Sequence, residues 1–577
     1  MKKRWIQAST TDVQTVNSFA GELSVDQLTA CLLLQRGLNS FEDARHFFRP
    51  SLDDLHDPFL MKDMDKAVER LTKAVHQSEK ILVYGDYDVD GTTAVTMMFS
   101  FLKKLGVSCE YYIPDRYTEG YGFSFAGVEY ARDNGIRLII TLDCGIKDGE
   151  KIAYAKTFGI DVIVCDHHNP GEIPNASAVL DPKRQDCSYP FDGLSGCGVG
   201  FKLIQAFCQQ QSIDEDFFLE YLDLLTISIG ADIVPIIDEN RILAYHGLQL
   251  LTASPRAGIA AMLEGASVKK KELNITDVVF ILAPRINAAG RIFSGKQAVE
   301  LLLSENIEDA KKLSPALEEN NQTRKLLDKE ITSEALEKIQ IDEFYQSSFT
   351  SVVAGKTWHK GVVGIVASRL IEVYYKPTIV LVDDGEKMSG SARSIDGIDL
   401  YDVLGECAEH LIQYGGHTMA AGLSLKSENF LSFRKKFDDV VRNHLNHKLP
   451  EPFIIYDAEV LFEELTPQFW RRLKQFAPFG PGNMKPVFMV KNVVNARYTR
   501  QVGETKTHLK LHVCQRQNPD FAMEGIGFDL GKWASIIEGG QEVDLLFTLE
   551  ENEWNNRITL QLSVKDIRLS ADVQAES

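Results

Sequence analysis

"KILVYGDYDVDGTTAVTMMFSFLKKL", residues 80–105, joins a short apolar run, aspartates at alternate positions and a helical pattern. The apolar run predicts a buried strand, and the pattern after the aspartates predicts a helix over about 92–105. Asp86, Asp88 and Asp90 lie between the two. Like charges so close together repel one another unless cations neutralise them. The stretch therefore indicates both a strand–helix unit and a metal site.

The same alternation continues to about residue 240 and is typical of βαβ units in a parallel sheet. Further strands are predicted at 109–113, 137–142 and 161–165, and further helices at about 147–157, 199–211 and 216–229. In such a sheet, ligands bind beyond the carboxyl ends of the strands. The residues that follow the third and fourth strands, together with one that follows an apolar helix, are Asp143, Asp166, His167, His168 and Asp232. We expect them to meet the first aspartates at one edge of the sheet.

A set of carboxylates and imidazoles without thiolates favours Mn²⁺ or Mg²⁺ over structural zinc. Two such ions bridged by a carboxylate would activate water and stabilise an in-line displacement at phosphorus. Each motif alone has an ordinary alternative: aspartates form turns, a histidine pair can lie on the surface, and Asp143 could cap a helix. Their occurrence at successive strand ends favours the metal site. Cys144 and Cys165 adjoin this site and are expected to be packing residues.

The whole chain is predicted to be an α/β protein. Two α/β lobes are joined by a long helix or helix pair, because residues 304–342 are rich in Glu, Lys, Leu and Ala and contain almost no helix breakers. Strand-like alternation after the "LPEP" at 449–452 predicts a small OB-like β-barrel. The predicted domains are an N-terminal helical region (1–60), a catalytic α/β domain (61–303), a connecting helix (304–345), a second α/β domain (346–448) and a barrel domain (449–577).

Composition limits the possible functions. The chain has 577 residues, 44% hydrophobic and 25% charged, as in an ordinary soluble globular protein. Its formal net charge of −20 means that any contact with nucleic acid must be local, since proteins that bind phosphates by bulk charge are usually basic. There is no apolar run of about 18 residues and no apolar signal segment. The nine cysteines form no CxxC pair, so we expect a cytoplasmic protein without zinc and without membrane contact.

Further motifs occur along the chain beyond the metal pattern. They include "LQRGLNS" (34–40), "GYGFS" (120–124), "LSGCGVGFKL" (194–203), "ADIVPIIDENRIL" (231–243), "LAPRINAAGR" (282–291), "NQTRK" (321–325), "WHKGVVGIVASRL" (358–370), "SGSARS" (389–394), "YGGHTMAAG" (414–422) and "PFGPGN" (478–483). On these residues and the "DHH" at 166–168, the chain resembles the DHH phosphoesterase superfamily and, within it, the RecJ family of single-strand-specific exonucleases. The resemblance covers nearly the whole chain. It identifies 61–303 as a DHH domain and 346–448 as a DHH-associated domain.

The resemblance implies roles for the clustered acidic and histidine residues. One or two Mn²⁺ or Mg²⁺ ions would be coordinated by Asp86, Asp88, Asp90, Asp143, His167 and Asp232, and the residues with catalytic roles would be Asp88, Asp143 and His168, of which His168 faces the scissile phosphate. Many relatives have a metal-binding histidine where this chain has Tyr84. A phenol with a pKa of about 10 is a poor ligand at pH 7. One of the two metals is therefore expected to bind weakly or together with the substrate.

The resemblance also implies a set of nucleic-acid-binding residues, namely Arg285, Asn287, Arg291, Arg369, Ser391, Arg393, Gly416 and His417. Planar guanidinium groups suit bidentate binding of phosphate oxygens. "SGSARS" is expected to be a loop that holds a terminal phosphate. The ordinary alternative for the arginines of "LAPRINAAGR" is a structural arginine network. The ordinary alternative for "YGGHTMAAG" is a helix end followed by a packed helix. On the barrel, residues that could follow the DNA are Arg497, Tyr498, Arg500, Lys506, His508 and Lys510, although a solvated strand face has the same composition.

The function implied by the resemblance is processive 5′-to-3′ degradation of single-stranded DNA to 5′-mononucleotides in recombination and repair. A single-strand-binding protein and a helicase are expected partners, and the expected state is a monomer. One alternative is a phosphodiesterase for short oligoribonucleotides or cyclic dinucleotides, which would resemble only the two α/β lobes. Another is a non-catalytic scaffold that binds single strands. A scaffold would have lost ligand carboxylates, whereas every expected aspartate and both histidines are present here.

Overall fold

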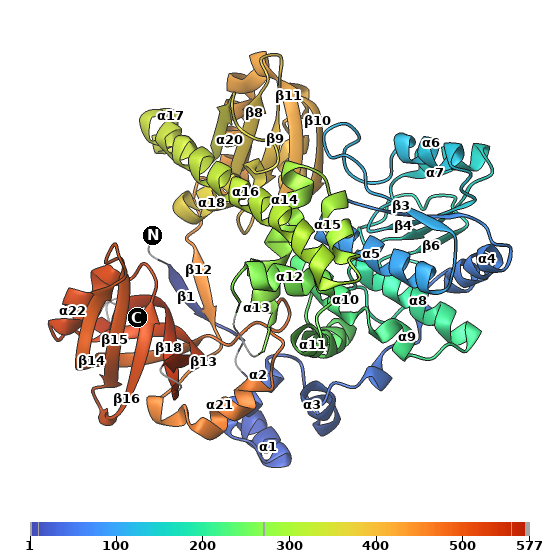
Figure 1. Ribbon diagram of the computed structural model, residues 1–577. Coiled ribbons are helices and arrows are strands. Elements are labelled where there is room, and N and C mark those ends of the chain that lie inside the picture. Colours follow the sequence, from blue (N-terminus) through green and yellow to red (C-terminus); the bar gives the residue numbers. More distant parts are fainter. Residues whose placement is uncertain (1–2, 10, 269–271, 555–556, 572–577) are drawn as a thin grey trace. The chain divides into compact units, whose positions relative to one another are not determined.

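The chain folds as two compact units. The computed structural model describes residues 3–9, 11–268, 272–554 and 557–571. The first unit extends from Asp54 to Pro452. The second combines the chain up to Asp53 with the chain from Phe453 on. Figure 1 shows both units coloured along the sequence. Among the described residues, no helix is long and apolar enough to cross a membrane.

A five-stranded parallel sheet forms the first layer of the Asp54–Pro452 unit. Its strands, in spatial order, are β3 (Cys109–Tyr112), β2 (Ile81–Gly85), β4 (Leu138–Leu142), β5 (Asp161–Cys165) and β6 (Ala178–Leu180). The four strands expected from the apolar runs are present. The fifth, β6, has only three residues, too few for a periodic pattern. All carboxyl ends point to one edge, so the loops after these strands share that edge.

Helices cover both faces of this sheet (Figure 1). One face packs against α6 (Phe125–Asp133) and α7 (Gly149–Thr157), with Leu82, Ile139 and Val162 in the shared core. The other face carries α5 (Val89–Lys104) and α8 (Gly196–Gln211). Side-chain caps begin α5 and α8, because the Asp88 carboxylate accepts from the Gly91 N–H and the Ser195 hydroxyl accepts from the Gly198 N–H.

The prediction of one helix over 216–229 is wrong in one respect, because the chain forms two helices there. They are α9 (Asp216–Leu219) and α10 (Leu222–Ala231). Phe217 and Phe218 pack edge-on against Phe101 and Phe201, respectively, which lie on different helices. The helix α10 is itself buried along almost its whole length. The chain therefore turns between α9 and α10, so that each helix can pack in its own place.

The connecting segment is one helix and not a pair. It is α16 (Ile307–Ile341), with 35 residues and Pro315 inside it. It leads to a second sheet with the order β10 (Leu411–His417), β11 (Ala420–Lys426), β9 (Lys387–Arg393), β8 (Thr378–Asp383) and β7 (Ser351–Gly355). Only β7 and β8 are parallel, and the other neighbours are antiparallel.

One expectation for this sheet is wrong, and one ordinary alternative is excluded. "SGSARS" is not a loop, because all but its last residue lie in β9 between β8 and β11. Its small residues are needed there, since a Cβ on Gly390 would lie 1.9 Å from the Val380 carbonyl oxygen. "YGGHTMAAG" does not end one helix and begin another. It forms the hairpin of β10 and β11, in which Gly415 pairs with Gly422.

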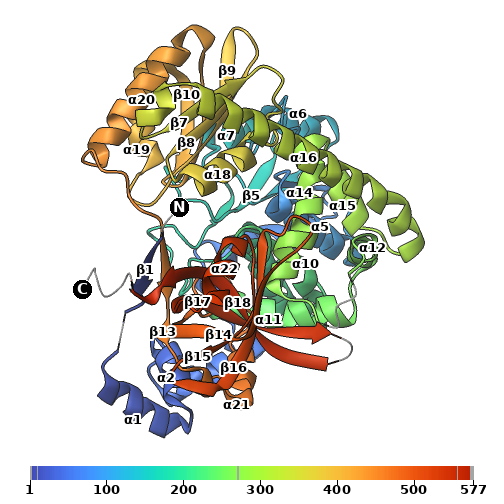
Figure 2. The same cartoon turned by 90° about the vertical axis from the view of Figure 1, so that its left-hand side faces the viewer.

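The second unit contains the expected barrel (Figure 2). Its closed circuit consists of β14 (Phe488–Val502), β15 (His508–Gln515), β16 (Asn518–Gly527), β18 (Arg557–Leu569) and β17 (Val543–Trp554), and β17 pairs back with β14. A closed five-stranded barrel has no free edges. The predicted α/β fold with a C-terminal OB-like barrel is thus confirmed.

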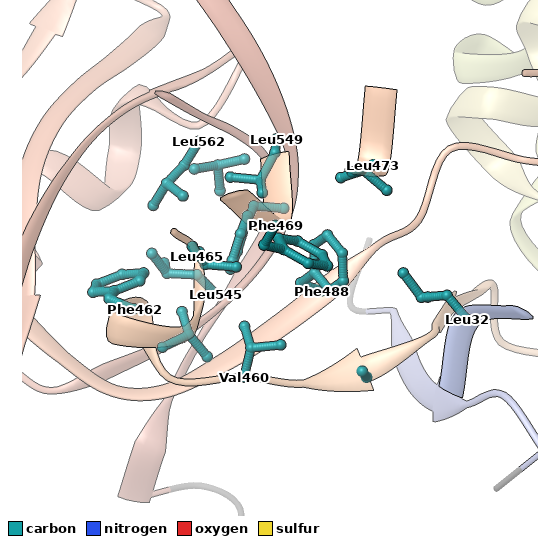
Figure 3. Packing of buried hydrophobic residues seen from close by; sticks show 14 of the residues in the cluster. Leu32, Val460, Phe462, Leu465, Phe469, Leu473, Phe488, Leu545, Leu549 and Leu562 are labelled. Atoms are coloured by element: carbon teal, nitrogen blue, oxygen red, sulfur yellow. The ribbon is translucent and has the colours of Figure 1, made fainter. Parts of the chain in front are cut away.

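The N-terminal helices share a core with this barrel. They are α1 (Val13–Leu23), α2 (Gln27–Leu34) and α3 (Phe41–Phe48), and they pack near α21 (Pro467–Lys474). Figure 3 shows Leu32 and Leu473 near Phe469 and Phe488, with the barrel residues Leu545, Leu549 and Leu562 beyond them. β1 (Arg4–Gln7) also pairs with β12 (Phe453–Tyr456). The limits of the five predicted domains stay predictions.

Candidate metal centre

Asp90 is held at the start of α8. Its Oδ2 accepts from the Gly196 N–H at 2.7 Å, and its Oδ1 accepts from the Cys197 N–H at 2.8 Å and from the Ser228 hydroxyl at 2.7 Å. Free backbone N–H groups and the helix dipole stabilise a carboxylate at this position. Asp90 is therefore a fixed, buried anion at the edge of the sheet.

Asp143 follows β4 in a left-handed conformation with φ +60°. Aspartate tolerates this region better than most residues, and such backbone strain is concentrated at functional sites. The start of α8 lies close by, since a Cβ on Gly196 would be 2.5 Å from the Asp143 Cβ. This glycine allows Asp143 and Asp90 to approach one another.

The "DHH" motif follows β5, and its aspartate orients the two histidines. Asp166 Oδ1 accepts from the His167 N–H at 2.7 Å and from His168 Nδ1 at 2.7 Å, while Oδ2 accepts from the Ile146 N–H at 2.9 Å. Burial alone would raise the pKa of Asp166, but its bond to His168 and these N–H groups lower it to about 2. Asp166 is thus a charged positioning residue, and the hydrogen bond to Nδ1 leaves His168 Nε2 facing outward.

His167 lies among three carboxylates. Its Nε2 is 3.1 Å from Asp143 Oδ1, 3.6 Å from Asp232 Oδ2 and 3.8 Å from Asp90 Oδ2. Ligands at the 2.0–2.1 Å bond lengths of Mg²⁺ are about 3 Å apart when adjacent and about 4 Å apart when opposite. Neither ring nitrogen of His167 makes a hydrogen bond to a described residue, although both are buried. The spacing and the unsatisfied nitrogen fit a shared cation.

The remaining aspartates of the first motif extend the cluster. Asp86 is fully buried, and its Oδ2 has no hydrogen-bond partner. In addition to burial, the charge of Asp88 raises the pKa of Asp143, so the two carboxyl groups repel one another unless a proton or a cation lies between them. Ligand atoms of Asp143, His167 and His168 form one potential metal group, and those of Asp90, His167 and Asp232 form another. The two groups share His167.

The electrostatics of the cluster disfavour its charged form without a cation. Burial, followed by Asp90 and Asp88, raises the pKa of Asp143 well above its usual value. The same causes raise the pKa of Asp232 to about 9, although its side chain is 31% exposed. Burial, and then the charge of Asp88, raise the pKa of Asp86 well above its usual value. Bound divalent ions reverse this repulsion, and the oxygen and nitrogen donors suit Mn²⁺ or Mg²⁺.

Tyr84 lies away from this cluster. Its hydroxyl donates to the Gly122 carbonyl at 3.0 Å and to the Ser124 hydroxyl at 3.3 Å, and its ring packs against Tyr112 and Phe123. The Gly122 N–H in turn approaches Asp86 Oδ1 at 3.4 Å. Tyr84 therefore supports the loop beside Asp86 and offers no ligand atom to a metal.

Arginines without carboxylate partners border the aspartates. Arg291 donates to Asn287 Oδ1 and to the Gly361 carbonyl, and burial followed by the charge of Arg116 lowers its pKa to about 10. Arg393 donates to the Ser391 hydroxyl and its guanidinium lies beside Gly364. Within the described ranges, Arg116, Arg291 and Arg393 have no ion pair. Such a group of cations attracts an anion.

Arg116 was missed in the sequence, although a signal for it existed. It lies just past Ile113, in the loop after the strand 109–113, where the strand-end rule that identified the aspartates also applies. Its guanidinium lies 5.1 Å from the centre of the Tyr87 ring. Tyr121 was also missed: its hydroxyl lies 3.1 Å from His168 Nε2.

Arg285 and Arg369, by contrast, are held by carboxylates. Arg285 Nε donates to Glu318 at 2.7 Å. Arg369 binds the buried Asp328 through Nε and Nη2 at 2.7–2.9 Å. The structure places both guanidinium groups in contacts with α16 and not beside the aspartates.

The hairpin residues Gly416 and His417 lie at the end of β10. Burial, and then the charges of Lys147, His168 and Lys183, lower the pKa of His417. Gly416 has φ +150°, and a Cβ there would lie 2.4 Å from the Ala420 carbonyl oxygen. A glycine is thus required beside His417.

The expected barrel residues lie on β14, β15 and the turn between them. Tyr498 donates to Glu524 at 2.9 Å, and Lys510 pairs with the same carboxylate at 3.4 Å. Arg500 lies over the Tyr498 ring at 5.6 Å. These contacts stabilise the barrel wall, which is the ordinary alternative for this set. The remaining members of the set are Arg497, Lys506 and His508.

Comparisons with known proteins agree with this geometry. Family models match residues 80–229 (DHH family, N-terminal domain), 346–443 (DHHA1 domain) and 456–566 (RecJ OB domain). The single-stranded-DNA-specific exonuclease RecJ of Salmonella typhimurium is 34% identical over 88% of this chain and 90% of its own length. The chain belongs to the RecJ family. The resemblance predicted from the sequence is confirmed.

Other RecJ proteins support the assignment. The Bacillus subtilis RecJ is 38% identical over 99% of this chain and 71% of its own length. The crystal structure of RecJ in complex with Mn²⁺ from Thermus thermophilus superposes with a TM-score of 0.84 and 27% identity, covering 98% of this chain and 79% of that one. An exonuclease RecJ bound to manganese gives a TM-score of 0.59 at 30% identity, over 70% and 98% of the two chains.

Proposed function

We propose that this chain is a metal-dependent exonuclease that degrades single-stranded DNA from the 5′ end to 5′-mononucleotides, in DNA recombination and repair. The observation that carries the proposal is the buried set of Asp90, Asp143, His167 and Asp232, whose ligand atoms are spaced for a divalent cation. The named activity of the RecJ relatives supplies the substrate class.

Each member of the site has a proposed role. Mn²⁺ or Mg²⁺ would be held by Asp86, Asp88, Asp90, Asp143, His167 and Asp232, and bound ions supply a Lewis acid that polarises the scissile phosphate and lowers the pKa of water. His168, oriented by Asp166 through Nδ1, presents Nε2 to a phosphate oxygen. Asp88 and Asp143 combine ligand and catalytic roles.

The cations beside the aspartates are proposed to hold the 5′-phosphate. Arg116, Arg291 and Arg393 carry charge without carboxylate partners, so a phosphate would replace the missing anions. Asn287 and Ser391 orient two of these guanidinium groups through hydrogen bonds. Gly416 and His417 would contact the strand from β10. Arg285 and Arg369 are left out of this group because carboxylates already bind them.

The wider setting is proposed from the family. The five domains predicted from the sequence would divide the work between the catalytic DHH domain, the DHHA1 domain and the OB barrel, whose Arg497 and Lys506 would follow the strand. The protein would act in the cytoplasm as a monomer, together with a single-strand-binding protein and a helicase.

A single experiment tests the activity. One DNA oligonucleotide, labelled at either end, is incubated with Mn²⁺, Mg²⁺ or EDTA alongside its duplex and its RNA counterpart. Metal-dependent release of mononucleotides from the 5′ end of the single strand only is expected. Preference for RNA of two to five residues would instead support the oligoribonuclease alternative. Tight binding without cleavage under every metal would support the scaffold.

A further inference from the structure

The strand order of the parallel sheet arranges charged groups along its carboxyl edge. From one side to the other, the loops after β3, β2, β4, β5 and β6 carry Arg116, then Asp86, Asp88 and Asp90, then Asp143, then His167 and His168, and finally Lys183. Neighbouring strands are about 4.8 Å apart. The strands β3 and β6 are the outer strands of the sheet (Figure 1). The loops after them therefore flank the metal centre, and each carries a cation.

The charges of the two flanks act on different parts of the cluster. On the β3 side, and against the larger effect of burial, the charge of Arg116 lowers the pKa of Asp86, and the charge of Asp88 raises the pKa of Arg291. On the β6 side, the charge of Lys183 acts on Asp232 and on His167. A strand that is held by its 5′-phosphate on the β3 side must continue past His168 towards the β6 side.

Lys183 is an unpaired cation on that second flank. Its backbone N–H donates to Asp181 Oδ1 at 2.8 Å, which fixes the turn after β6. The next residue, Arg184, is buried in ion pairs with Asp63 and Asp186. The half-buried Lys183 ammonium, in contrast, makes no hydrogen bond or ion pair with any described residue. The turn is thus built by Asp181 and Arg184, and the Lys183 charge is left free.

Lys147 provides a second free ammonium at the same edge of the sheet. It follows β4, is exposed and also has no ion pair within the described part of the chain, although Lys151 nearby binds Asp148 at 2.5 Å. Asp166, which holds His168 through Nδ1, also accepts from the Ile146 N–H and donates its own N–H to the Leu180 carbonyl. The loops that carry Lys147 and Lys183 therefore begin beside the residue that orients His168.

We propose that Lys183 and Lys147 bind the DNA phosphate that follows the scissile linkage on its 3′ side. This inference rests on the proposed exonuclease function. A chain with a net charge of −20 repels each further phosphate of the strand. Free ammonium groups at this edge of the sheet offset that repulsion and fix the register of the strand over His168. They thereby position the scissile linkage and are not catalytic residues.

The test removes each partner of this contact in turn. The variant is Lys147→Gln/Lys183→Gln, and the control is Lys435→Gln on α20 (Phe430–His444), an exposed lysine without an ion pair among the described residues. The substrates are a 5′-phosphorylated single strand and the same strand with one uncharged methylphosphonate at its second linkage. The first cleavage is measured as kcat/KM with Mn²⁺, and the melting temperature checks folding.

For the unaltered protein and the control, the methylphosphonate is expected to lower kcat/KM about tenfold. The double variant should have a kcat/KM on the natural strand about tenfold below that of the unaltered protein. Its kcat/KM should fall no further on the methylphosphonate strand, and its melting temperature should be unchanged. An undiminished methylphosphonate effect in the double variant would overturn this inference alone. If the unaltered protein hydrolyses neither strand with any metal, the proposed function falls, and this inference with it.

Discussion

Two arginine environments in the Asp54–Pro452 unit differ in one respect. Arg291 and Arg393, near the aspartates, bind only neutral oxygens. Arg369, on α18 (Val363–Tyr374), binds the buried carboxylate of Asp328 on α16 through two nitrogens. The first pair lacks an anion that a substrate phosphate can supply, whereas Arg369 already has one. The difference teaches that an unpaired charge is a better sign of a binding site than the residue type.

The carboxylates show the same contrast, with negative instead of positive charges. Asp143 and Asp232 are carboxylates without a cation, and their pKa values are raised by burial and then by neighbouring aspartates. Asp328, which is as buried as Asp143, has its cation in Arg369. Functional groups in this unit are thus those whose charge the protein itself leaves uncompensated, at a cost in stability.

The largest effect is expected from Asp143→Asn, which tests the role of the uncompensated carboxylates. Asparagine fits φ +60° and keeps the shape of the side chain, but it removes a ligand charge. Hydrolysis is expected to fall on the order of 10³-fold or more, while the melting temperature in EDTA stays equal or rises because repulsion is relieved. Strand binding, measured by fluorescence anisotropy, should change little. Equal loss of binding and hydrolysis would show a structural role instead.

Arg393→Ala tests the unpaired arginines. Without this guanidinium, the preference for a 5′-phosphorylated end over a 5′-hydroxyl end is expected to fall about 10-fold to 100-fold, the range for a charge-assisted hydrogen bond. The ratio of kcat/KM for the two ends measures it. The rate on the 5′-hydroxyl strand serves as the control and should stay close to that of the unaltered protein. An unchanged preference would remove Arg393 from the 5′-phosphate site.

Arg369→Gln tests the paired arginine. The change leaves the buried Asp328 carboxylate without its partner and is expected to lower the free energy of unfolding by about 1–3 kcal/mol. Activity per folded molecule should remain within about twofold. Denaturant unfolding provides the measurement, and Arg369→Gln/Asp328→Asn should recover part of the loss. A large effect on DNA binding with unchanged stability would reverse the distinction drawn between the two environments.

The smallest effect is expected from Tyr84→Phe. It removes two buried hydrogen bonds, to Gly122 and Ser124, and should cost about 1 kcal/mol of stability. Because the hydroxyl points away from the cluster, the Mn²⁺ concentration that gives half-maximal activity should not change. A marked shift in that concentration would place Tyr84 in the metal site after all.

Topology explains which parts of the site were predictable. Asp143, His167 and His168 follow apolar strands, and parallel strands end at one edge, so local pattern alone brings them together. The same rule would have found Arg116 after β3. It would not have found Lys183, because β6 is only three residues long and gives no periodic signal.

Contacts between residues far apart in the sequence could not be predicted from sequence patterns. Arg369 and Asp328 are 41 positions apart and meet only because α18 packs on α16. The "SGSARS" stretch has the composition of a loop, yet it forms β9 because its small residues fit between two close strands. In both cases tertiary packing, and not local propensity, decides the outcome.

The central claim is that a divalent cation lies between Asp90, Asp143, His167 and Asp232. Anomalous diffraction at the manganese edge from crystals soaked in Mn²⁺ tests it directly. A peak within coordination distance of these four side chains is expected for the unaltered protein, and none for Asp143→Asn. Crystals of the unaltered protein without such a peak, at Mn²⁺ concentrations that support hydrolysis, would contradict the account.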